Sequence, residues 1–164
     1  MSSPDSVAAA LLDGIKTGRY VPGQRLIEAD LTADLAAEQI DIGGNRDRFR
    51  SAYEKLVALR DLPDADVMLD ERARFYETLV TLSDNRELSR FVPIPQTNLL
   101  RTQLSHYAGA RERARQFKDY DSIAKHVLAG NGPGAESVMQ RHIRNSRLSI
   151  DRLGDEAFAN AALA

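Results

Sequence analysis

The chain has 164 residues, a formal net charge of −2 at neutral pH and no cysteine. This length predicts one compact domain with at most a small appendage, and the balanced charge argues against a protein that coats nucleic acid or a membrane surface. The lack of cysteine excludes disulfides, thiolate nucleophiles and zinc–thiolate sites. No run approaches the roughly 20 apolar residues of a membrane span, and no basic leader precedes the first apolar run, so we expect a soluble cytoplasmic protein.

Apolar residues recur at steps of three and four along most of the chain, which predicts a series of helices. Glycine, proline and short polar clusters separate them. No segment shows sustained alternation with β-branched enrichment, so the predicted fold class is all-α, an antiparallel helical bundle. The predicted helices are residues 5–17, a short helix beginning near Glu28 or Ala29, a helix capped by Asn45 and broken at 62–64, residues 65–82, a turn of helix at 87–91, and residues 96–107, 110–128 and 134–153.

The last predicted helix has a polar residue in the middle of its apolar face. Val138, Met139, His142 and Ser146 recur at helical spacing and should point inward. A buried imidazole without a partner costs about 1–3 kcal/mol, so His142 must meet a hydrogen-bond partner, a ligand or a charge. The opposite face is crowded with arginines: Arg141, Arg144, Arg147 and Arg152.

Polar residues also interrupt the inward faces of other predicted helices. Tyr76 and Tyr120 lie in two such stripes, Arg72 precedes Tyr76 by one turn, and Arg101 belongs to the helix at 96–107. Inward polar residues on facing helices can build a ligand pocket, and arginine binds planar carboxylates well. The alternative is that the tyrosines are core aromatics and the arginines extend into solvent. Together with the inward histidine, the set favours a small-molecule pocket.

Motifs for metal binding or catalysis are absent from the sequence. Its three histidines, His106, His126 and His142, show no metal-binding spacing, and the first two are expected at the surface or at helix ends. No Gly-x-Ser-x-Gly motif, phosphate-binding glycine loop or placed carboxylate pair is found. With no nucleophile and no partnered general base to name, we expect a protein that is not an enzyme.

Residues 15–35, IKTGRYVPGQRLIEADLTADL, resemble the opening of a GntR-type winged helix-turn-helix. In that family a helix is followed by Gly-x-(Tyr/Leu)-x-Pro-Gly-x-x-Leu and a second helix, and then by a recognition helix and a β-wing. Here Leu35 leads almost directly into a stretch similar to the end of an FCD-domain helix. The resemblance implies that a stretch on the order of half a small domain is missing, either from the protein or only from the given sequence. Without a recognition helix, the resemblance implies that Lys16, Arg19 and Arg25 contact at most the phosphates of DNA. The alternative is that they are solvated surface charges.

Two later stretches, RFYETLVTLSDNREL (74–88) and DYDSIAKHVLAGNGPGAESVMQRHIRNS (119–146), resemble the FCD effector-binding domain of the FadR subfamily. Its usual forms are Asp-x-x-Phe-His-x-x-Leu…Gly-Asn-x-x-Leu and Glu-His-x-x-Ile…Gly-Asp…Ala…Met-x-x-His. The resemblance implies a bacterial transcription regulator with an N-terminal DNA-binding part. Its helical C-terminal domain would dimerise and bind a small metabolite. Ligand binding would then change the spacing of the two DNA-binding heads.

FCD domains often hold a divalent metal with one aspartate and three histidines, and this sequence departs from that set. The matching positions are Arg72, Tyr76, Tyr120 and His142, of which only His142 is retained. A guanidinium repels a cation, and a neutral phenol is a poor substitute for imidazole. We therefore expect neither a metal nor another cofactor, and we expect Arg72 to supply the positive charge that holds a carboxylate effector.

These observations predict a partial winged-helix domain at 1–35, an FCD-like effector-binding and dimerisation domain at 36–154, and a frayed tail at 155–164. The expected partners are operator DNA if the winged helix is complete, a small carboxylate and a second copy of the chain, with no membrane. The alternative is a helical ligand-sensing or interaction module without DNA binding of its own. Comparing the intact mass of the native protein with 18.2 kDa would distinguish the two possibilities. The predicted effector site comprises Arg72, Tyr76, Arg101, Tyr120, His142 and Asn145, with Ser146 as a further contact.

Overall fold

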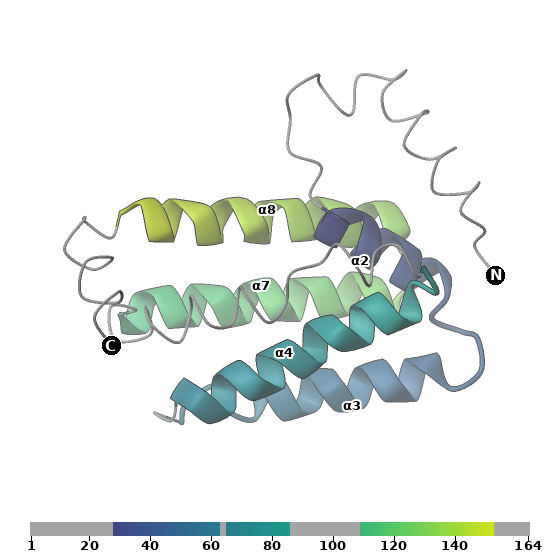
Figure 1. Ribbon diagram of the computed structural model, residues 1–164, viewed down its shortest axis with the longest axis horizontal. Helices are drawn as coiled ribbons and strands as arrows, with labels where there is room; N and C mark the ends of the chain where they lie inside the picture. Colours follow the sequence, from purple (N-terminus) through teal and green to yellow (C-terminus); the bar gives the residue numbers. More distant parts are fainter. Residues whose placement is uncertain (1–27, 63–64, 86–108, 153–164) are drawn as a thin grey trace, which may run out of the picture.

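The computed structural model describes residues 28–62, 65–85 and 109–152. In these ranges every regular element is an α-helix, and the described residues contain no strand, so the predicted all-α class is confirmed. None of the described helices is long and apolar enough to cross a membrane. The helices are α2 (Glu28–Glu38), α3 (Asn45–Val57), α4 (Ala65–Leu82), α7 (Ala110–Leu128) and α8 (Gly132–Asp151) (Figure 1).

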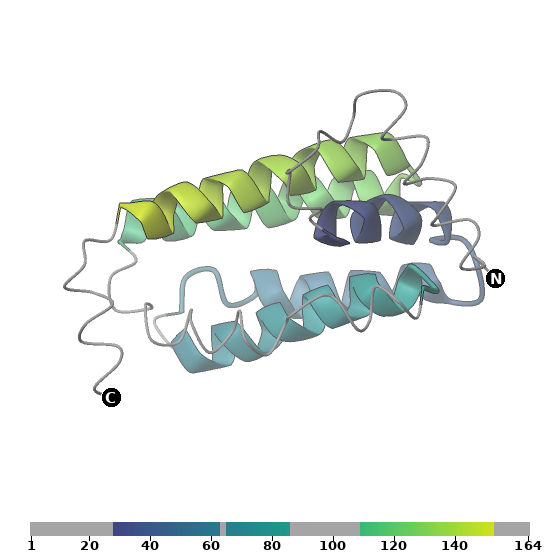
Figure 2. The ribbon, with the colours of Figure 1, turned by 45° about the horizontal axis from the view of Figure 1, so that its top comes forward.

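The helices form two layers. The antiparallel pair α7 and α8 lies in one layer and the antiparallel pair α3 and α4 in the other (Figures 1 and 2). The shorter α2 packs at one end, where it contacts α8, α4 and α7. The two layers meet through α3 against α7 and through α2, so side chains from α4, α7 and α8 can meet inside the bundle.

The turn between α7 and α8 is built by two glycines and an asparagine. Gly130 has φ of 66°, a left-handed conformation that favours glycine at a helix end. The side-chain oxygen of Asn131 then accepts a hydrogen bond of 2.9 Å from the backbone N–H of Gly134, which caps α8. A Cβ at Gly132 would collide with the carboxylate of Asp34 in α2, so glycine lets α2 approach the start of α8. The helix therefore begins two residues before the predicted Gly134.

Aromatic rings from three helices meet in the core. Phe75 of α4 has ring centroids 5.4 Å from Phe49 of α3 and 5.7 Å from Tyr120 of α7, and Phe117 lies 5.8 Å from Tyr120. All four side chains are buried. Helical spacing did not predict that Phe75 points inward, because one stripe of apolar residues describes a helix that is covered on one side only. In the structure α4 is covered by both α3 and α2, which widens its buried face.

Most predicted boundaries within the described ranges agree with the structure. The helices predicted at 65–82 and 110–128 have those limits. The prediction that Asn45 caps α3 is wrong: Asn45 is the first residue of the helix, its side-chain amide donates to the carbonyl of Gln39 over 2.9 Å, and Gly44 occupies the cap position.

The predicted domain boundary at residue 35 falls inside α2. This helix packs against the rest of the bundle, so residues 28–35 lie together with the helical domain. Several predicted segments lie outside the described residues. They are the remaining N-terminal residues, the helices predicted at 5–17, 87–91 and 96–107, and the tail predicted at 155–164. The division into three parts therefore stays a prediction.

Candidate functional site

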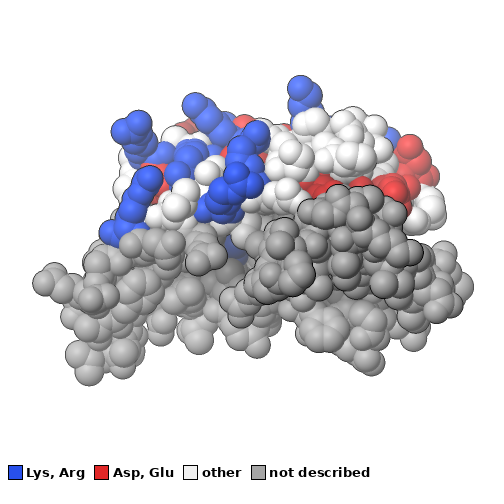
Figure 3. Space-filling model, turned by 90° about the horizontal axis from the view of Figure 1, so that it is seen from above, with Lys and Arg blue, Asp and Glu red and all other residues white. Residues whose placement is uncertain are grey.

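Helix α8 has the two different faces that its sequence predicts. Val138, Met139, His142 and Ser146 are buried. The outward face is exposed at Arg141, Arg144 and Arg152, and Figure 3 shows lysines and arginines gathered over one half of the surface on this side. An imidazole thus lies inside the protein beneath a basic surface.

His142 is held by hydrogen bonds at both ring nitrogens. Its Nε2 lies 2.6 Å from the hydroxyl of Tyr76 in α4, and its Nδ1 lies 3.2 Å from Oδ2 of Asp119 in α7. The ring is only 2% exposed. The requirement that a buried histidine must have partners is therefore met by residues of two other helices.

Tyr120 completes this cluster from α7. Its ring centroid lies 5.3 Å from that of His142 and 6.5 Å from that of Tyr76. The hydroxyl of Tyr120 is fully buried, interacts with the guanidinium of Arg72, and has no partner at good hydrogen-bond geometry within the described part of the chain. Such a group is rare in proteins, because burial without a partner is unfavourable by about 1–3 kcal/mol.

Arg72 is buried beside the two tyrosines. Its guanidinium carbon lies 4.7 Å from the ring centroid of Tyr76, which is a cation–π contact. Burial by itself would lower the pKa of Arg72, but the nearby oxygens of Tyr120 and Tyr76 outweigh burial and raise that pKa overall. The guanidinium therefore stays charged, and the alternative that Arg72 extends into solvent is excluded because the residue is only 5% exposed.

Asp119 belongs to the cluster, although the sequence did not single it out. Its Oδ2 also lies 3.4 Å from the side-chain amide of Asn145. Burial tends to raise the pKa of Asp119, but the hydrogen bond and charge of His142, the hydrogen bond from Asn145 and the charge of Arg141 lower it overall. The available signal was its place directly before Tyr120, where the related FCD motif has Glu before His. Periodicity alone does not separate it from the surface acid Asp121.

The structure thus brings together most of the predicted site. Arg72, Tyr76, Tyr120 and His142 converge, and Asn145 reaches them through Asp119. His126 lies at the end of α7, as predicted, with Nδ1 3.1 Å from the side-chain nitrogen of Asn131. The predicted residues outside the described ranges are Arg101, His106, Lys16, Arg19 and Arg25.

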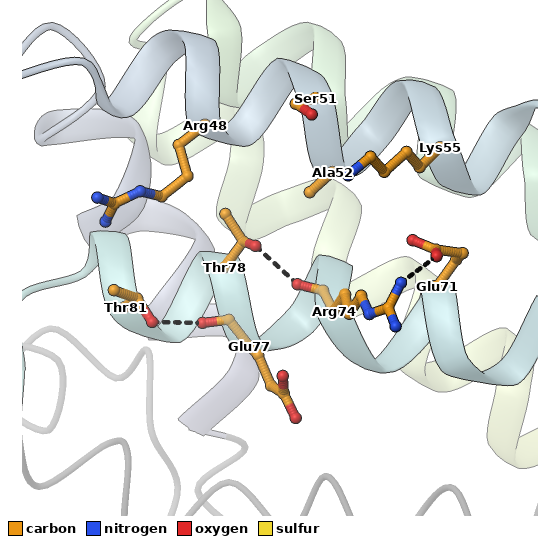
Figure 4. Close-up of a pocket in the computed structure, with 9 residues that line it drawn as sticks. All are labelled: Arg48, Ser51, Ala52, Lys55, Glu71, Arg74, Glu77, Thr78 and Thr81. Atoms are coloured by element: carbon orange, nitrogen blue, oxygen red, sulfur yellow. Dashed lines mark hydrogen bonds and ion pairs between the residues drawn. The ribbon is translucent and has the colours of Figure 1, made fainter.

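An open groove of about 400 Å³ lies between α3 and α4 (Figure 4). On a helix, Arg74 and Thr78 face away from Tyr76, so this groove is separate from the buried cluster. Its polar groups are partly paired within α4, by the Arg74–Glu71 ion pair and by the Thr78 hydroxyl on a backbone carbonyl. We assign it no function. It is lined by Arg48, Ser51, Ala52, Lys55, Glu71, Arg74, Glu77, Thr78 and Thr81.

Helical bundles build ligand sites from inward polar side chains on facing helices, and the cluster of Arg72, Tyr76, Tyr120 and His142 has this arrangement. Residues 24–145 match the FCD domain family, and the chain belongs to this family. The family supplies the C-terminal regulatory domain of GntR-family transcription regulators. No curated protein matches the chain. The family match includes residues 24–35, which the sequence assigned to the winged-helix part.

The residues at the family's usual metal positions do not fit a divalent cation. One of them is the charged Arg72, and both nitrogens of His142 already have partners in Tyr76 and Asp119. The described residues contain no group of three or more histidine, cysteine, aspartate or glutamate side chains that could hold a metal. Loss of the metal stays a prediction for purified protein.

Proposed function

We propose that this protein is a bacterial transcription regulator of the FadR subfamily whose FCD domain binds a small anionic metabolite of the carboxylate type. The observation that carries this proposal is the charged guanidinium of Arg72, buried against Tyr76 at the centre of the bundle. A planar guanidinium binds carboxylates by two parallel hydrogen bonds, and the attraction is stronger away from water. Arg72 would replace the positive charge that a metal offers in related domains.

The neighbouring side chains suit the rest of such a ligand. The buried hydroxyl of Tyr120 lies near Arg72, where it would donate a hydrogen bond to a ligand oxygen held by that guanidinium. Tyr76 would supply a further uncharged hydrogen-bonding atom, with Asn145 and Ser146 a turn beyond, and His142 would bind the ligand by exchanging its contact with Tyr76 or Asp119. Arg101, outside the described residues, would be a second anion-binding arginine.

The DNA-binding part of the proposal depends on the resemblance of residues 15–35 to a winged helix-turn-helix. The regulator would act as a homodimer, and effector binding would change the spacing of its DNA-binding heads. Lys16, Arg19 and Arg25 would contact phosphates only. The second candidate is a ligand-sensing module without DNA binding of its own, which the missing recognition-helix stretch favours. Intact mass of the native product against 18.2 kDa separates the two.

The effector site is tested by metal analysis of purified protein together with a thermal-shift screen of small carboxylates. We expect no stoichiometric metal and a rise in Tm with at least one carboxylate. Arg72→Gln should abolish that rise, measured against the variant's own Tm. Arg60→Gln is the matched control, because Arg60 also stacks on a ring, 5.4 Å from Phe117, but is exposed.

Two outcomes would overturn the proposed site. A tightly bound divalent ion would mean that the residues aligned with the family's ligands are out of register. Equal ligand responses in Arg72→Gln and Arg60→Gln would exclude Arg72 as the anion-binding group.

The histidines provide a further test. His142→Ala should weaken effector binding more than His106→Ala or His126→Ala in a ligand titration.

A further inference from the structure

The outer faces of α7 and α8 carry positive charges that the function proposed so far does not use. The cations of this surface, which we call the basic face, recur at helical spacing and are exposed. They are Arg111, Lys118 and Lys125 of α7, Arg141 and Arg144 of α8, and Arg152 directly after α8. Each of the two helices turns its buried residues, such as Tyr120 and His142, to the core on the opposite side.

The two helices place these charges side by side. They run antiparallel in one layer and face the same core, so their outer faces form one surface (Figures 1 and 2). Arg115 of α7 contacts Ser149 of α8, which puts Arg111 near the level of Arg152. Figure 3 looks down on α8 and shows lysines and arginines gathered over one half of this side, with the acids mainly at the other end. Along α7, Arg111 and Lys125 are about 21 Å apart, at 1.5 Å per residue.

The cations of the basic face form no ion pair within the described part of the chain. Other arginines of the bundle do so: Arg46, Arg60 and Arg115 each lie within 2.7 Å of a carboxylate oxygen. The acids of α7 and α8 whose side chains are described are buried or half-buried. The positive charge of the basic face is therefore available to a negatively charged partner outside the chain.

The chemistry of the basic face fits the phosphate backbone of DNA. A small anion needs a pocket, and the groove described above is lined by α3 and α4. Protein interfaces are depleted in lysine, and helices that bind membranes need apolar side chains beside the cations. Among the residues of α7 and α8 whose side chains are described, Leu148 is the only large apolar one that is exposed. Interfaces with DNA are instead polar and strongly positive, and each DNA strand presents a phosphate about every 3.4 Å.

We propose that the basic face binds the phosphate backbone of duplex DNA and is a second DNA contact of this protein. The net charge of the whole chain is −2, so the attraction is local to this surface. The inference goes beyond the proposed function, in which the helical domain binds the effector and residues 15–35 contact DNA. Phosphate contacts carry no sequence information, so the basic face binds any duplex and holds the helical domain against the DNA.

The test measures the affinity of the full chain for a fluorescently labelled duplex of arbitrary sequence, about 20 base pairs long, from about 50 to 200 mM salt. The slope of the logarithm of the association constant against the logarithm of the salt concentration reports the number of phosphate contacts. The double variant Lys118→Gln/Arg144→Gln should reduce this slope by about 2, one for each lost contact. Both side chains are exposed, so Tm should stay unchanged.

The matched control removes one arginine and one lysine from the other layer. Arg48 and Lys55 of α3 are exposed and form no ion pair within the described residues. The double variant Arg48→Gln/Lys55→Gln changes the net charge equally and should leave the slope unchanged. Equal reductions in the two double variants would show a long-range effect of net charge and would overturn the proposal. A wild-type chain that binds no duplex at the lowest salt would overturn it too.

Further outcomes separate the basic face from the proposed function. Replacing Lys16, Arg19 and Arg25 by glutamine removes the other predicted phosphate contacts, and salt-dependent duplex binding should persist in this variant. Its complete loss there, with no effect of Lys118→Gln/Arg144→Gln, would overturn the proposal. So would an unchanged slope in Lys118→Gln/Arg144→Gln together with dissociation of a dimer, or binding to phosphatidylserine vesicles without binding to duplex. If no carboxylate raises Tm, the effector function fails while the duplex titration still decides this proposal.

Discussion

Helix α7 carries two aspartates, two residues apart, in opposite environments. Asp119 contacts His142 and Asn145 inside the bundle, and its side chain is 8% exposed. Asp121 accepts hydrogen bonds from Tyr53 at 2.9 Å and Arg60 at 2.7 Å, with its side chain 36% exposed. Both carboxylates therefore connect α7 to another helix through an aromatic residue. Asp119 does so away from water, and Asp121 does so at the protein surface.

The comparison shows that the same residue type at neighbouring positions can serve two purposes. At Asp121, water screens the ion pair with Arg60, and such pairs contribute at most about 1 kcal/mol. Burial, followed by the hydrogen bond and charge of Asp121, raises the pKa of Tyr53, so this phenol stays neutral. At Asp119 screening by water is weak, so the contacts of this carboxylate with His142 and Asn145 should stabilise the fold more strongly.

The largest difference should appear when each carboxylate is removed. Asp119→Ala leaves His142 and Asn145 without their buried acceptor, so we expect the free energy of unfolding to fall by about 3 kcal/mol. Asp121→Ala should lower it by about 1 kcal/mol or less. Urea unfolding of both variants measures this. Equal losses would contradict the distinction between the two sites.

Acid should reduce the contribution of the buried Asp119 to the stability of the fold. The folded pKa of Asp119 lies below its unfolded value, which is about 3.9, so its stabilising contribution is present above that value. The contribution is lost as pH falls through the folded pKa. The stability difference between wild type and Asp119→Asn should shrink as pH falls below about 4. Urea unfolding across this range tests the sign, and a difference that grows in acid would refute it.

The smallest effect is expected from the two tyrosine hydroxyls. Tyr76→Phe removes the partly buried hydrogen bond to His142 and should lower stability by about 1–1.5 kcal/mol. Tyr53→Phe removes a bond to the partly solvated Asp121, where water can replace the hydroxyl, and should lower it by about 0.5 kcal/mol. Thermal unfolding of the pair sharpens the comparison. A larger loss from Tyr53→Phe would reverse it.

Much of the candidate site could be predicted from its spacing. His142 was marked by its place in an apolar stripe, and Arg72 and Tyr76 by lying one turn apart on the same face. Resemblance to FCD domains then connected these positions with Tyr120 in another helix, and the structure shows all four in one cluster. The helical period is a local feature of the sequence and the family pattern is an inherited one, so both can be recognised without a structure.

Other features needed the packing of several helices. Phe75 is buried because α4 is covered on two sides, and the start of α8 lies close to α2 because Gly132 leaves room for Asp34. The two aspartates of α7 differ only in what packs beside them. None of these contacts is encoded by the spacing within one helix.

By itself the sequence determined the helical class, the limits of the helices at 65–82 and 110–128, and which face of α8 is charged, because periodicity acts within a single helix. The tertiary structure alone decided that Asp119 is the partner of His142, and that Arg72 lies buried against Tyr76 with its charge retained. The physical reason is that burial, screening and hydrogen-bond direction depend on side chains brought together from distant parts of the chain.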